Sequence, residues 1–173
     1  MSQTTLDIRE PGLNVVPPGV ERHVVNAGGL TGLQIFPDDE IEIINDEGNQ
    51  ICEIICFDKD GKSEIGILSL KENSKKSFIK EILKKKDESS LVTNLQLKKR
   101  NLDIDKSKSS ILFDNKTPSG EKIKIKSKDK CYVIFSAPQN DMMVSEQNPS
   151  SDLTIFIKRA KIVNDKELSV IPD

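Results

Sequence analysis

Residues 45–61, with the sequence NDEGNQICEIICFDKDG, contain the pattern that decides the fold. Turn-forming residues at 46–49 and 58–61 enclose a run in which Ile, Cys and Phe dominate. A short apolar run between two such turns is typical of a β-strand in an antiparallel sheet. We therefore predict a strand over 50–57 at the centre of a three-stranded meander. The strand before it contains alternating Ile and Glu, and the strand after it covers 64–70.

The remainder of the chain adds further strands and one helix. Residues 74–86 place apolar side chains on one stripe and lysines around the rest, which is the pattern of an amphipathic helix. Short alternating or apolar runs predict further strands over 20–26, around 111–113, and over 122–126, 130–136 and 153–157. We expect a mainly β protein, an antiparallel barrel or sandwich, with the helix packed on it.

Length and composition favour a single domain. The chain has 173 residues, of which 35% are apolar, 31% charged and 4% aromatic, as in a protein with an aliphatic core. We predict an extended lead-in over 1–19, one β-rich domain over 20–160 and a tail or linker over 161–173. The start of the chain lacks the pattern of a signal peptide, and no apolar run is long enough to cross a bilayer. We therefore expect a cytoplasmic protein.

The Lys-rich segment 71–108 is the main charge feature of the chain. A nucleic-acid-binding surface would combine such charge with interleaved aromatic residues, but Phe78 is the only aromatic residue here. Glu81 and Asp87 also interrupt the basic run. We interpret the segment as a solvated helix and loop, and we expect neither nucleic acid nor a membrane as a partner.

The cysteines and the single histidine do not predict a metal or redox site. On a strand, Cys52 and Cys56 lie about 13 Å apart, too far for one metal ion or a disulfide. Cys131 could join one of them, but a free cysteine is commonly a small buried hydrophobe. We predict structural thiols, a structural His23 and no metal site. Near misses to calcium loops, phosphate-binding loops and nucleophile elbows around Gly61 identify no catalytic residue.

The register of the predicted hairpin selects two candidate ligand-binding residues, Glu42 and Glu53. A tight turn at 46–49 places Ile43 opposite Cys52 on an apolar face and Glu42 opposite Glu53 on the other face. Like charges across a ladder are unfavourable without a basic partner, solvent or a bound cation. The pair is therefore either a solvated or salt-bridged pair or a ligand site, and a ligand site would raise the pKa of one carboxyl.

A family resemblance appears at the same residues. Residues 36–54, FPDDEIEIINDEGNQICEI, resemble the urea-carboxylase-associated domain family, in which a Pro-Gly-Asp turn, a strand and a Gly-Gly-Gln-Val-x-Asp stretch recur. The chain is similar in particular to the N-terminal module of glycine-cleavage-T-like aminomethyltransferase chains, and the similarity extends to 20–32 and 146–160. It departs from the family pattern at three positions, where Gly, Gly and Asp are replaced by Asp38, Asn49 and Glu53. The family's later cysteine-containing half is not recognisable, so no metal or catalytic role is carried over.

The resemblance implies a β-rich accessory domain in the metabolism of small nitrogen compounds. We expect a non-catalytic domain, for small-molecule binding or interdomain contact, that accompanies an aminomethyltransferase-like domain or subunit. The alternative is an enzyme acting on a small amine or a folate-linked one-carbon substrate through an acidic site. A small amine or amino-acid-like ligand fits either hypothesis, and the sequence identifies no cofactor. The candidate ligand-binding residues are Glu42, Gln50 and Glu53.

Overall fold

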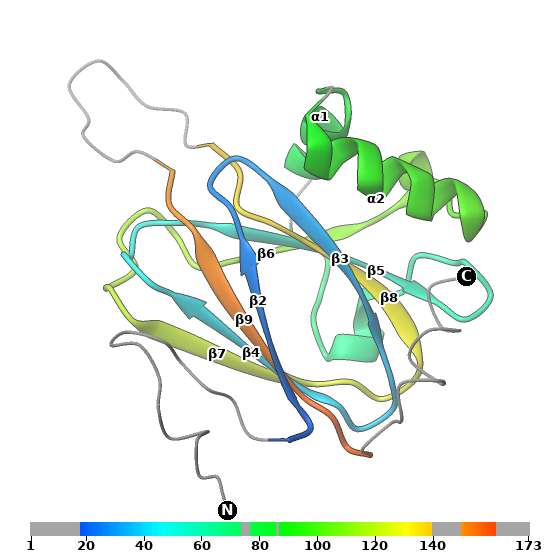
Figure 1. Cartoon of the computed structure of the whole chain (residues 1–173), viewed down its shortest axis with the longest axis horizontal. Coiled ribbons are helices and arrows are strands. Elements are labelled where there is room, and N and C mark those ends of the chain that lie inside the picture. The colour runs from blue at the N-terminus through cyan, green and yellow to red at the C-terminus, as the bar shows by residue number, and fades with distance from the viewer. Residues whose placement is uncertain (1–17, 74–76, 86, 140–149, 162–173) are drawn as a thin grey trace, which may run out of the picture.

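The protein is a sandwich of two four-stranded antiparallel sheets, as the computed structural model shows for residues 18–73, 77–85, 87–139 and 150–161 (Figure 1). The first sheet has the order β2 (Val20–Val25), β9 (Leu153–Lys158), β4 (Glu40–Asn45), β7 (Glu121–Lys126). The second sheet has the order β3 (Leu30–Ile35), β8 (Cys131–Ser136), β5 (Cys52–Asp58), β6 (Ser109–Leu112). The predicted mainly β class is confirmed, and because neither sheet closes on itself the fold is a sandwich rather than a barrel.

The main core lies between the two sheets. Ile41, Ile43 and Ile155 of the first sheet face Cys52 and Cys56 of the second sheet, and all five side chains are fully buried. Alternate residues of each strand reach this core, which is the packing expected of a sandwich. The prediction that the two cysteines of the opening stretch face inward is confirmed.

A second core lies on the outer face of the second sheet, under two helices. α1 (Phe78–Leu83) and α2 (Glu88–Lys99) cover this face (Figure 1). Ile55 and Phe57 of β5 pack there with Ile79 and Leu97 of the helices. Because β5 is covered on both faces, it reads as a continuous apolar run rather than an alternating one.

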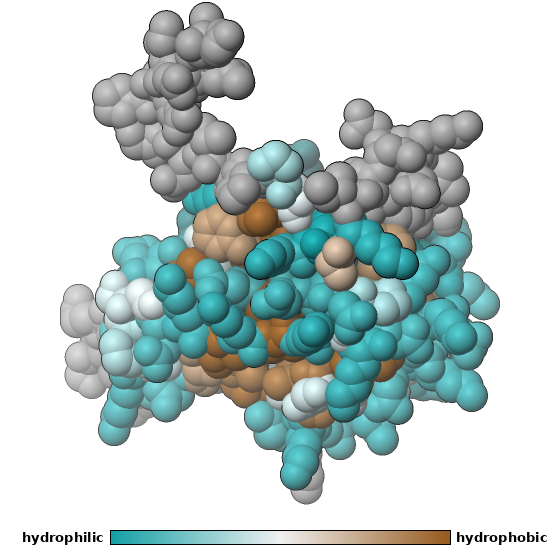
Figure 2. All heavy atoms as spheres, turned by 90° about the horizontal axis from the view of Figure 1, so that it is seen from below, coloured by the Kyte–Doolittle hydropathy of each residue, from teal (hydrophilic) through white to brown (hydrophobic). Residues whose placement is uncertain are grey.

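The surface outside these cores is largely polar. On the face shown in Figure 2 hydrophilic residues dominate, and apolar residues show between them near the centre. No helix within the described ranges is long and apolar enough to span a membrane.

The predicted three-stranded meander is wrong in two places. The residues before and after the turn at 46–49 belong to different sheets, so this segment is a corner between β4 and β5 and not a hairpin. The reason is that the corner packs on another loop: Asn49 N–H donates to the Thr117 carbonyl at 2.8 Å. The buried Asn45 side chain also donates to the Gln50 carbonyl at 2.6 Å. The predicted strand over 64–70 is instead a short 3₁₀ helix, η1 (Ile65–Leu68).

The helices differ from the prediction in number. A helix is present within the predicted range 74–86, as α1, although residues 74–76 and 86 lie outside the described part. α2 was missed because its buried face carries Ser90 and Thr93, whereas Leu91 and Leu95 point outward. The Ser90 hydroxyl donates to the Ile82 carbonyl of α1 at 2.7 Å, so a polar contact takes the place of an apolar stripe. A second 3₁₀ helix, η2 (Ile104–Lys106), follows α2.

Candidate functional site

The three residues selected from the sequence do not come together. Glu42 lies on β4 of the first sheet, where its cross-strand neighbour on β7 is Lys124. The two side chains form an ion pair of 3.8 Å, and the Lys124 side chain is largely exposed. Glu53 lies on β5 of the second sheet. The predicted pairing of Glu42 with Glu53 is therefore wrong, because the chain changes sheets between them.

Glu53 is a buried anchor for a helix. Its carboxylate accepts hydrogen bonds from the backbone N–H groups of Ile79, at 2.6 Å, and of Phe78, at 3.2 Å. Burial raises the pKa of Glu53, and these N–H donors together with the Ser109 hydroxyl oppose part of that rise. The carboxylate thus ties the first turn of α1 to the sheet.

Gln50 is also occupied by structural contacts. The buried side chain donates from Nε2 to the Pro138 carbonyl at 2.8 Å, and its Oε1 accepts from Ser151 N–H at 2.9 Å. It therefore joins the ends of β8 and β9 to the corner between β4 and β5. Neither Gln50 nor Glu53 lines the crevice that lies between the end of α2 and the second sheet.

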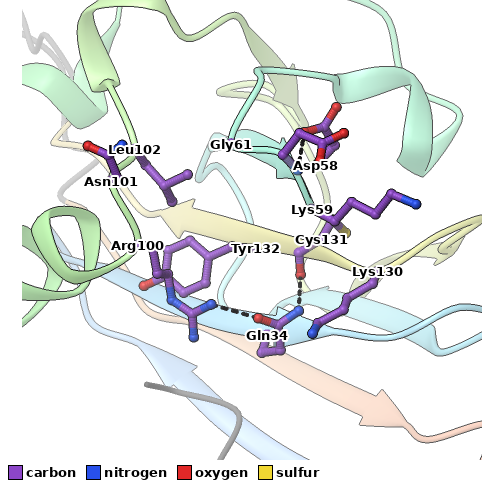
Figure 3. A pocket seen from close by; sticks show the side chains of 11 residues that line it. Gln34, Asp58, Lys59, Gly61, Arg100, Asn101, Leu102, Lys130, Cys131 and Tyr132 are labelled. Carbon is purple, nitrogen blue, oxygen red and sulfur yellow. Dashed lines mark hydrogen bonds between the residues drawn. The ribbon is translucent and has the colours of Figure 1, made fainter.

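A crevice of two adjoining cavities lies where the end of α2 meets the second sheet. The first cavity has a volume of about 330 Å³ and the second about 420 Å³. Both are lined by Gln34 of β3, Tyr132 of β8 and Arg100 at the end of α2. Figure 3 shows these three side chains beside the turn that contains Asp58.

The end of α2 places Arg100 over the sheet. Asn101 adopts a left-handed conformation, with φ of 56°, and Leu102 N–H donates back to the Leu97 carbonyl at 2.9 Å. This is the Schellman arrangement that terminates a helix. The Arg100 guanidinium then lies 4.4 Å from the centroid of the Tyr132 ring, a cation–π contact.

Gln34 fixes the orientation of Arg100. Arg100 Nη1 donates to Gln34 Oε1 at 2.7 Å, and Gln34 Nε2 donates to the Cys131 carbonyl at 2.9 Å (Figure 3). Both ends of the Gln34 amide are therefore held. The guanidinium faces the crevice from a defined position, as recognition of a charged group requires.

Gly32 makes room for the Tyr132 ring. A Cβ atom at Gly32 would lie 2.6 Å from Tyr132 Cζ and closer still to the hydroxyl oxygen. Gly32 of β3 and Tyr132 of β8 lie on paired neighbouring strands. The Tyr132 ring therefore lies directly on the backbone of β3 at Gly32. Burial raises the pKa of the Tyr132 hydroxyl.

We expect Gly32→Ala to lower the free energy of unfolding by about 1–3 kcal/mol, because the new methyl group forces the Tyr132 ring out of its position. Urea unfolding followed by circular dichroism measures the change. The same substitution made in a Tyr132→Ala background should cost much less, since the ring is absent. An equal cost in both backgrounds would show that the ring is not the obstacle.

Arg159 also lines the second cavity. Its buried guanidinium donates to Glu21 Oε2 at 2.7 Å, to Asp39 Oδ2 at 2.7 Å and to the Gln34 carbonyl at 2.9 Å. The pKa of Glu21 is lowered to about 2, chiefly by the hydrogen bond with His23, against burial, with Arg159 adding to the effect. Arg159 thereby joins β9 to the β3–β4 connection.

The three cysteines lie in the interior of the protein. Cys52, Cys56 and Cys131 are all free and buried. Burial raises the pKa of the Cys52 thiol, which disfavours the reactive thiolate. Within residues 18–73, 77–85, 87–139 and 150–161, no group of three or more His, Cys, Asp or Glu side chains is placed to hold a metal ion.

Sequence reasoning missed the residues of the crevice. Gln34, Arg100 and Tyr132 come from three distant segments, and none belongs to a recognisable motif. The available signal was the pair Arg100-Asn101 at the end of a Lys-rich run, since Asn is common just after a helix. That signal needs α2 to be identified first.

Comparison with known proteins relates the chain to part of an enzyme. No family model matches the chain. The chain is 32% identical over 153 residues to a trimethylamine-oxide aldolase of Ruegeria pomeroyi. The match covers 88% of this chain but 19% of the relative, so the chain spans about a fifth of the length of that protein.

Proposed function

We propose that this chain is a non-catalytic β-rich domain of small-amine metabolism that docks on an aminomethyltransferase-like enzyme, within one longer chain or as a separate partner. The observation that carries the proposal is the match of nearly the whole domain to 19% of a trimethylamine-oxide aldolase. A module that corresponds to so small a part of an enzyme supports an accessory role. The resemblance of residues 36–54 to the urea-carboxylase-associated domain family supports the same metabolic context.

The outer face of α2 is the surface that we assign to docking. Among the described residues, the large apolar side chains that stay exposed are Leu91, Val92 and Leu95, which are 54%, 54% and 57% exposed. Leu91 and Leu95 are one helical turn apart, so they form a continuous apolar stripe with Val92 beside it. Such a stripe is a typical feature of a surface that another protein covers.

The alternative enzyme hypothesis depended on an acidic site built from Glu42 and Glu53. The two carboxylates lie on different sheets, and each has its own structural partner in Lys124 or in the N–H groups of α1. This separation of Glu42 from Glu53 supports the accessory role as the better proposal.

The proposal is tested by mixing the purified chain with the aminomethyltransferase-like enzyme of the same organism. Analytical size exclusion and isothermal titration should detect a complex. Leu95→Glu should weaken it at least about tenfold, since a charge then enters an apolar interface. Lys98→Ala, which makes the same change in net charge at another exposed position of α2, is the control and should change the affinity little.

Two results would overturn the proposal. One is the absence of any complex at protein concentrations of about 100 μM. The other is conversion of trimethylamine oxide by the isolated chain, as measured by proton NMR. A chain that catalyses this conversion is not a non-catalytic accessory domain.

A further inference from the structure

We propose that the free edge of β3 receives an extended segment of the partner enzyme, which adds as a fifth strand to the second sheet. The inference rests on the proposed function and deepens it, because it names the form in which the partner binds beside the exposed stripe of α2. β3 is the outer strand of the second sheet, and β8 is the only described strand that pairs with it. An outer strand presents a row of backbone N–H and C=O groups with which another chain can pair.

The register shows which backbone groups of β3 point outward. The Gly29 carbonyl accepts a hydrogen bond of 3.1 Å from the backbone N–H that directly follows β8, so it points towards β8. Because this direction alternates along an antiparallel ladder, the backbone groups of Leu33 also point towards β8, and those of Gly32 and Gln34 point away. The Arg159 side chain agrees with this assignment, since it reaches the Gln34 carbonyl at 2.9 Å from the first sheet, just after β9.

The outward backbone groups of Gly32 are open. Within the described residues, no hydrogen bond reaches its N–H or C=O from the side away from β8. The second cavity, of about 420 Å³, is lined by Gly32, Leu33 and Gln34 of β3, by Val92 of α2 and by Glu21 of β2. α2 covers the outer face of the second sheet, β2 belongs to the sheet on its inner face, and both contact β3 (Figure 1). The cavity is therefore a groove along the free edge of β3.

The other edge of the same sheet is covered. β6 is the outer strand there, and the Asn73 side chain occupies the outward backbone groups of Ile111. Asn73 Oδ1 accepts from Ile111 N–H at 2.6 Å, and Asn73 Nδ2 donates to the Ile111 carbonyl at 3.0 Å. Natural proteins commonly cover their sheet edges, because an open edge pairs with other chains. The edge at Gly32 is therefore the one at which the second sheet can be extended.

The chemistry and the position of the groove identify its occupant. A row of backbone N–H and C=O groups is matched by an extended polypeptide. Val92 belongs both to the groove and to the exposed stripe of α2, so a partner that covers the stripe also reaches the edge. Leu33, Phe36 and Tyr132 also line the groove. The occupant is therefore an extended segment with apolar side chains, from the same partner that covers the stripe.

The test is amide hydrogen exchange, resolved by residue with NMR, of the nitrogen-15-labelled chain alone and with the aminomethyltransferase-like enzyme of the same organism. In the isolated chain the amides of Gly32 and Gln34 should exchange at least about tenfold faster than that of Leu33, which the ladder protects. In the complex both amides should slow at least about tenfold. Unchanged exchange at Gly32 and Gln34 in a complex that protects α2 would overturn the added strand.

Thr31→Lys tests the same edge by mutation. Thr31 is half-buried and lies on the same face of β3 as Leu33, which packs against the core between the sheets. A lysine there reaches water in the isolated chain but is covered when a strand is added, which is how natural edge strands prevent pairing. We expect at least about tenfold weaker binding, and equal affinity would contradict the proposal.

Thr31→Val is the matched control. It keeps the branched shape of the side chain without a charge, so it should bind as the native chain does. Weaker binding by both variants would show that the loss does not come from the charge, and would contradict the mechanism. If Thr31→Lys does not fold, the exchange of Gly32 and Gln34 in the native chain decides.

Failure of this inference and failure of the proposed function give different results. Absence of any complex would overturn the proposed function and the added strand with it. A complex that Leu95→Glu weakens, but in which Gly32 and Gln34 exchange as in the isolated chain, would remove the added strand alone. Slow exchange of Gly32 in the isolated chain, with a doubled mass by light scattering, would show that a second copy of this chain pairs with β3. That result would overturn the assignment to the enzyme.

Discussion

Arg159→Met is expected to lower the free energy of unfolding by about 3–5 kcal/mol, because it leaves buried carboxylate oxygens without their cation. The Asp39 side chain, which is 2% exposed, loses its 2.7 Å contact with the guanidinium. Glu21 loses two hydrogen bonds, from Arg159 Nε and Nη2. Chemical unfolding at pH 7, followed by circular dichroism, measures the loss.

The control for Arg159 is its neighbour in the sequence. Lys158→Met removes the same charge at an exposed position of β9 and should change the free energy of unfolding by less than about 0.5 kcal/mol. If the two substitutions cost the same, the three-way contact of Arg159 with Glu21, Asp39 and Gln34 would not stabilise the sandwich as its burial suggests.

Glu53→Ala is expected to lower the free energy of unfolding by about 2–4 kcal/mol, because the buried Ile79 N–H and the partly buried Phe78 N–H lose the Glu53 carboxylate and the side chain leaves a cavity. The affected donors are Phe78 and Ile79, at the start of α1. The loss should appear in urea unfolding and as faster amide hydrogen exchange across α1. A cost below about 0.5 kcal/mol would contradict the anchoring role.

Glu53→Gln tests the electrostatic side of the same contact. Burial raises the folded-state pKa of Glu53 above its unfolded value of about 4.3, so the folded state binds this proton more tightly. The contribution of Glu53 to the free energy of unfolding therefore falls as the pH rises from the unfolded-state pKa towards the higher folded-state pKa. The glutamine side chain of Glu53→Gln does not ionise. The difference in the free energy of unfolding between the native chain and Glu53→Gln should therefore change with pH between the two pKa values of Glu53. Parallel pH profiles would contradict the raised pKa.

The sequence was sufficient to predict most of the strands but not their partners; β3 was missed, and the strand predicted over 64–70 is the 3₁₀ helix η1. β5 was recognisable because an apolar run stands between two turns, and β7 because Ile123 and Ile125 alternate with lysines. The sequence predicted a hairpin at the corner between β4 and β5, because a corner between sheets and a hairpin within one sheet use the same turn residues. What distinguishes them is tertiary: a Cβ at Gly48 would lie 2.6 Å from the Thr117 carbonyl oxygen, so the turn packs on a distant loop.

The error at the corner also produced the wrong pairing of Glu42 with Glu53. A change of sheet carries Glu42 and Glu53 apart, and it turns Glu53 towards a helix that the sequence places 25 residues later. The crevice depends on α2, whose apolar residues Leu91 and Leu95 face outward. Helix periodicity fails there because the buried contacts of α2 are partly polar, as at Ser90.

Hydrogen exchange of this chain, measured with and without the aminomethyltransferase-like enzyme, tests the accessory role most directly. We expect slower exchange in the complex at the amides of α2, centred on Leu91 to Leu95, with exchange in the sheets of the sandwich unchanged outside the edge strand β3. Unchanged exchange across α2 at saturating enzyme would contradict the accessory role. Protection confined to the first sheet, on the side away from α2, would also contradict it.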